Sequence, residues 1–168
     1  WIMADDATMT LSAVILPTEI AHTLGSLTMA YAPADANDKW FYSLVNVTAS
    51  SGDLIAGNFL CDSAGVAVGS SNPAIREASD LVKFLFIKNT GTTDGSSSTT
   101  RSVYVCFDGG TAAYNTGDVL EIGAGESWYG KPTNALVGNI HAVTGNRYGA
   151  SAGSGNIQCI VAAVIDDS

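Results

Sequence analysis

The residues of this chain that could do chemistry are two histidines, three cysteines and scattered carboxylates. His141, Asp108 and Ser127 supply a base, an orienting acid and a nucleophile, the residue types of a hydrolytic triad. A triad depends on three-dimensional geometry, however, and the chain has no Gly-x-Ser-x-Gly turn to present a serine. It also lacks a P-loop, a dinucleotide fingerprint and an HExxH motif. We therefore predict a protein that is not an enzyme and that has no catalytic residues.

The potential metal ligands are too few and too scattered to indicate a metal site. With only His22 and His141, a histidine-rich centre is excluded. Acidic pairs could offer oxygen atoms to calcium, but none has the Asp/Asn alternation followed by Gly of an EF-type loop; these pairs are Asp5 with Asp6, Asp35 with Asp38, and Asp166 with Asp167. Glu126, which follows Gly125, is typical of the exposed flank of a turn more than of a general acid. We expect solvated turn charges, no metal site and no cofactor.

The cysteines favour a reduced protein. Cys61, Cys106 and Cys159 show no CxxC spacing, and three residues cannot all pair within one chain. Cys106 and Cys159 lie inside apolar runs, where a free thiol behaves as a small hydrophobic side chain. This predicts free, buried thiols in a protein assembled in a reducing cytoplasm.

Aromatic residues leave sugar binding open as an alternative. Trp40 and Tyr104 lie in strand-like segments, where such residues usually pack. Tyr114, Tyr129 and Tyr148 lie in segments predicted as loops and could present exposed rings to a sugar. A carbohydrate-binding adhesion module is therefore one function to test.

The charge balance argues against two classes of partner. There are 16 acidic and 7 basic residues, a formal net charge of −9, which repels nucleic acid and anionic membranes. No apolar run approaches the roughly 20 residues that a membrane-spanning helix needs. We predict no nucleic-acid partner and no membrane partner.

The pattern of apolar and turn-forming residues predicts an all-β fold. Residues 81–88 and 102–108 are rich in β-branched and aromatic types and flank a polar segment, 89–100, made of Gly, Ser, Thr, Asn and Asp. Further strands are expected at 8–16, 26–31, 39–48, 54–61, 118–122, 126–132, 135–143 and 156–166. Two short helical segments are expected: residues 18–24, between Pro17 and Gly25, and a single turn at 72–73. We predict an antiparallel β-sandwich of jelly-roll type with long Gly/Ser/Thr loops.

The domain organisation is expected to be simple. A chain of 168 residues without a repeat or linker indicates one domain, 1–168. Residues 1–16 are predicted either as an N-terminal arm that adds to a neighbour's sheet or as an ordinary first strand.

Several segments resemble small structural proteins of tailed phages, especially those that infect cyanobacteria. The resemblance lies in residues 35–42, 53–57, 82–91, 121–128 and 157–167 and covers most of the chain from Asp35 onward. It implies a virion structural protein, most specifically a capsid decoration (cement) protein that binds and stabilises the head shell, with a tail or neck component as the alternative. Its implied partners are the major capsid protein and further copies of itself, as a homotrimer, and its implied place is the phage particle assembled in the host cytoplasm.

Overall fold

The computed structural model of this chain describes residues 7–14, 23–31, 38–55, 78–132, 134–146, 151–152 and 155–166. The described secondary structure consists of strands and one short 3-10 helix, η1 (Val137–Asn139). All strand pairs are antiparallel. The prediction of an all-β, antiparallel fold is confirmed.

One sheet is built around the C-terminal strand. Its order is β3-β11-β5-β8, with bounds β3 Asp38–Val47, β5 Leu81–Asn89, β8 Ser127–Gly130 and β11 Ile157–Asp166. Strand β11 pairs with β3 along its full length and with β5 on its other side. Its run of Ile, Val, Ala and Cys suits this central position, because a strand with neighbours on both sides is rarely left exposed.

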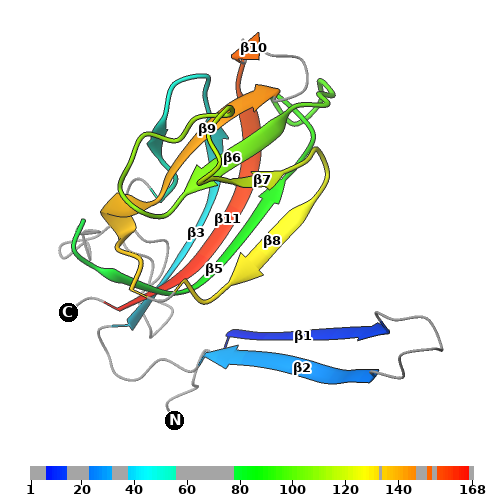
Figure 1. Cartoon of the computed structure of the whole chain (residues 1–168), viewed down its shortest axis with the longest axis vertical. Helices are drawn as coiled ribbons and strands as arrows, with labels where there is room; N and C mark the ends of the chain where they lie inside the picture. The colour runs from blue at the N-terminus through cyan, green and yellow to red at the C-terminus, as the bar shows by residue number, and fades with distance from the viewer. Residues whose placement is uncertain are drawn as a thin grey trace.

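The second sheet has β9 and β6 at its centre. Its order is β10-β9-β6-β7, and β4 pairs with β9; the bounds are β4 Gly52–Asp53, β6 Ser102–Cys106, β7 Leu120–Ile122, β9 His141–Asn146 and β10 Ser151–Ala152. Figure 1 shows β6, β7 and β9 as a layer in front of β3, β11 and β5.

A single large apolar cluster joins these two sheets. It takes Phe41 and Val161 from the four-stranded sheet and Val103, Ile122 and Ala142 from the five-stranded sheet, all buried. Packing of two amphipathic sheets over one core is the main source of stability in such a fold.

The N-terminal strands form a separate two-stranded sheet. Strands β1 (Ala7–Val14) and β2 (Thr23–Tyr31) pair with each other, with a register shift between Leu11 and Ala13. Among the described residues, neither pairs with a strand of the larger sheets. In Figure 1 this hairpin lies beyond the ends of β3 and β5, outside the two-layered body.

Several predicted elements differ from the structure. Thr23 and Leu24, expected at the end of a helical turn, belong to β2, because they pair with Val14 and Ala13 of β1 beyond a register shift. The remainder of that turn, most of the expected strand 54–61 and the turn at 72–73 lie outside the described residues. Leu54 and Ile55 are buried but lie in a bend, and the expected strand 135–143 is replaced by an isolated bridge at Leu136, helix η1 and then β9.

Candidate functional site

Among the described residues, a cluster of side chains that could do chemistry surrounds His141, the first residue of β9. Its ring Nδ1 lies 2.7 Å from the Gly110 carbonyl oxygen, and its Nε2 lies 3.3 Å from Oδ1 of Asp53. Pairing of β4 with β9 places Asp53 opposite His141, so the contact follows from strand register. Both neighbours of the ring are oxygen acceptors, and the contacts of the ring connect β4 and the 107–112 loop to β9.

Cys106 completes this cluster. It pairs with His141 across β6 and β9, and its thiol Sγ donates to the same Gly110 carbonyl over 3.1 Å. Burial raises the pKa of Cys106, and the nearby Asp108 and Asp118 carboxylates add to the rise. A nucleophilic cysteine requires the opposite, a thiolate favoured by a neighbouring positive charge. Cys106 is therefore suited to packing, and its expected burial as a free thiol is confirmed.

The residue types proposed for a hydrolytic triad are not assembled as one. Asp108 accepts a hydrogen bond from the Gly110 backbone N–H at 2.9 Å. Ser127 lies on β8 in the other sheet, in register with Lys88. The partner of His141 is Asp53, which sequence analysis missed because 88 residues separate the two and only the pairing of β4 with β9 brings them together.

The tyrosines expected to present free rings are used in packing. Tyr114 lies edge-on to Tyr104 with ring centroids 6.5 Å apart, and Tyr129 lies in strand β8 and packs on the cluster of Phe84 and Val164. Tyr148 lies outside the described residues. Trp128 packs on Phe107 with centroids 5.5 Å apart. The two described tyrosines are half-buried and lie in different sheets or loops, so they do not form a joint stacking platform for a sugar.

The carboxylates examined for calcium binding or acid catalysis have structural roles where they are described. Glu126 is exposed, and its Oε2 accepts the Gly123 backbone N–H at 2.9 Å, which confirms the turn interpretation. Asp166 forms an ion pair with Lys83 at 2.6 Å. The pair Asp5 and Asp6, as well as Asp35, Asp167 and His22, lie outside the described residues.

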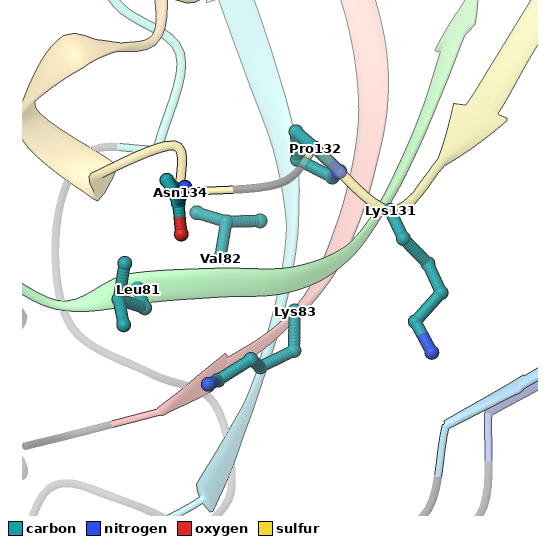
Figure 2. A pocket seen from close by; sticks show the side chains of 6 residues that line it. All are labelled: Leu81, Val82, Lys83, Lys131, Pro132 and Asn134. Atoms are coloured by element: carbon teal, nitrogen blue, oxygen red, sulfur yellow. The ribbon is translucent and has the colours of Figure 1, made fainter.

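A shallow hollow lies where β5 begins and β8 ends. Its volume is about 210 Å³, and its lining consists of Leu81, Val82, Lys83, Lys131, Pro132 and Asn134. Figure 2 shows the Lys83 and Lys131 side chains pointing in different directions, away from a common centre. Small-molecule sites are usually larger, about 300–1,000 Å³, with polar groups that converge. The hollow does not have the features of a ligand site.

The outer face of the four-stranded sheet carries exposed apolar side chains. Tyr42 and Leu44, two residues apart on β3, are 54% and 55% exposed and are the exposed large hydrophobic residues of the described chain. Ala162 and Ile160 of β11 lie opposite them in register, and Phe86 of β5 lies opposite Ala162. Tyr42 and Leu44 lie within the strand predicted at 39–48, but the sequence alone did not show which face of that strand would be exposed.

The described residues contain no cluster of three or more His, Cys, Asp or Glu side chains that could hold a metal ion. Within the same residues, no helix has the length and apolar character needed to cross a bilayer. No protein-family model matches the sequence, and no match was found among the curated proteins or among the solved structures.

Proposed function

We propose that this chain is a virion structural protein of a tailed phage, a capsid decoration (cement) protein that binds and stabilises the head shell. On this proposal it is not an enzyme, it uses no cofactor, and it resides in the phage particle. Its partners are the major capsid protein and further copies of itself in a homotrimer. The connection of strands between the two sheets is proposed to be of jelly-roll type, since β3, β4, β5 and β6 alternate between the sheets.

The observation that carries this proposal is that the domain has a buried apolar core and, in addition, surfaces on which a strand edge or apolar side chains are exposed. The core cluster consists of buried apolar side chains from both large sheets, and the polar side chains of His141 and Asn89 form hydrogen bonds that hold loops in place. Outside this body, the β1–β2 hairpin pairs with no other described strand, and Tyr42 and Leu44 are exposed. Surfaces of this kind favour assembly with other protein chains.

The acidic charge agrees with a protein partner. A net charge of −9 opposes binding to the packaged nucleic acid and therefore favours the outer surface of a shell over its interior. The resemblance to phage structural proteins supports a place in the phage particle, and the charge and shape of the chain support binding to other proteins of that particle.

The experiment is binding to purified head shells of the encoding phage that have been stripped of accessory proteins. We expect saturable co-sedimentation with many copies per shell, and a higher melting temperature of the decorated shells. Cryo-electron microscopy of the virion should place the density on the capsid. Absence of the chain from purified virions by mass spectrometry, or density on the tail, would overturn the cement assignment.

A further inference from the structure

The β1–β2 hairpin is an element that needs a partner. A two-stranded hairpin in water is marginally stable by itself, and most strands gain stability from a third strand or a packed face. Strands β1 and β2 pair with each other, and no further described strand pairs with either. None of the residues in Ala7–Val14 or Thr23–Tyr31 is charged, so the two strands add nothing to the net negative charge of the chain.

Strand β3 offers a matching open edge. All ten residues of β3 pair with β11 on one side, and no described strand pairs with its other side. Such an edge has unpaired backbone N–H and C=O groups that can accept another strand. Strand β3 has 10 residues, while β1 and β2 have 8 and 9, so the lengths allow pairing over most of the edge.

Charge and exposure also favour contact between the hairpin of one copy and the β3 edge of another. From Trp40 to Val47, β3 contains no charged residue, and its outer face exposes Tyr42 and Leu44. Two copies that each carry a net charge of −9 repel overall, so contact is least unfavourable where both surfaces are neutral. The hairpin and the β3 edge are two such surfaces.

We propose that the β1–β2 hairpin is an exchange arm that adds, in a second copy of this chain, to the edge of β3 with which no described strand pairs, against Tyr42 and Leu44. The proposal rests on the proposed function in treating the chain as a subunit that associates with itself. Six residues, 32–37, join β2 to β3 and can span at most roughly 20 Å, so the donor and acceptor bodies must lie side by side.

The proposed contact joins two different surfaces. Each copy gives one arm and receives one, which makes the contact head-to-tail. Such contacts close into a ring when the rotation between neighbours divides a full turn, and a homotrimer is one closed solution. In a closed ring every arm and every β3 edge is occupied, so arm exchange provides a route to the oligomer that leaves neither surface exposed.

Cross-linking of the purified full chain tests which copy supplies the arm. Both variants are made in a Cys61→Ser background. Thr10→Cys places a thiol on the arm of a chain that carries a long tag, and Leu44→Cys places one on the β3 edge of an untagged chain, so that the two chains differ in size. Cys106 and Cys159 are buried and serve as a constant background. With a short bis-maleimide, we expect a mixed dimer only when both variants are present.

Other cross-linking results contradict the proposal. A chain that carries both cysteines and cross-links within itself, when diluted with excess unlabelled chain, would show that the arm covers its own β3. Dimers of Thr10→Cys alone would show hairpin-to-hairpin contact, and absence of any cross-link at concentrations where the chain is oligomeric would place the interface elsewhere.

A charge variant gives an independent readout. Leu44→Asp puts a carboxylate on the edge, and Thr100→Asp puts the same charge on an exposed loop as a control. With circular dichroism to show that both fold, light scattering should find Leu44→Asp monomeric where the wild type and Thr100→Asp are oligomeric. An unchanged mass for Leu44→Asp, or a wild type that is monomeric throughout, overturns arm exchange. Arm exchange without shell binding would leave this inference standing and reject only the decoration role.

Discussion

Asn89, the last residue of β5, donates from Nδ2 to the backbone carbonyl of Ile122 on β7 over 3.1 Å and so ties the two large sheets together. The second Nδ2 hydrogen is donated to the Arg101 carbonyl at 3.0 Å, and Oδ1 accepts the Gly91 N–H at 2.9 Å. The side chain is fully buried, and both ends of its amide are engaged. One amide thus fixes the start and the end of the loop between β5 and β6.

Replacing this amide should destabilise the whole domain. Asn89→Leu would leave the Ile122 and Arg101 carbonyls without their amide donor, and we expect a loss of about 2–4 kcal/mol in the free energy of unfolding. Urea denaturation measures this loss. Asn115→Leu, the same substitution at an exposed position, should change stability by less than about 0.5 kcal/mol. Equal effects of the two variants would show that the amide does not hold the sheets together.

Gly145 on β9 is required by close packing. A Cβ at this position would overlap the Tyr114 side chain and come within 3.2 Å of the Tyr104 ring. Gly145→Ala should therefore cost about 1–3 kcal/mol through overpacking. At Gly117 a Cβ would meet no atom within 4 Å, so Gly117→Ala is the matched control and should be close to neutral. Thermal unfolding followed by circular dichroism compares the two, and equal melting temperatures would refute the packing argument.

The strands were predictable where residue type alone decides the conformation. Residues 157–165 are almost wholly apolar, and they form the central strand β11. Residues 81–88 and 102–106 alternate or concentrate β-branched and aromatic types, and they form β5 and β6. These segments bury their side chains in any two-layered fold, so no knowledge of their partners is needed.

Long-range pairing was not predictable from the sequence. Asp53 lies outside the strands predicted from the sequence, yet it pairs with His141 as part of β4 and contacts its ring. Residues 89–100 were predicted as a polar segment between two strands, but Asn89 is fully buried and the Thr90 hydroxyl donates to the Gln158 carbonyl at 2.8 Å. The sequence shows that Asn89 and Thr90 are polar, but their burial depends on carbonyl acceptors that lie 12 to 68 positions away in the chain.

The contacts of His141 should stabilise the junction between β4 and β9. His141→Ala removes both the Gly110 and the Asp53 contacts, and we expect a loss of about 1 kcal/mol in the free energy of unfolding, since both contacts are partly exposed. His141→Asn retains a donor near the position of Nδ1 and should recover part of the loss. Urea denaturation measures the stability of both variants. No difference between His141→Ala and the wild type would show that these contacts do not stabilise the junction.

Alkaline pH should reveal the burial of Cys159. Burial raises the pKa of this thiol from 9.0 to about 12, so the folded state keeps the proton that the unfolded chain releases above pH 9. A raised folded-state pKa contributes stability that is complete below the unfolded value and is lost as pH rises from about 9 toward 12. Between pH 8 and pH 10, the free energy of unfolding of the wild type should fall by about 1 kcal/mol more than that of Cys159→Ala, which has no thiol at position 159 to ionise. Urea denaturation under reducing conditions measures this difference. The other groups that titrate at alkaline pH are common to both proteins. Equal losses of stability in the two proteins would therefore show that the Cys159 thiol ionises equally in the folded and unfolded states.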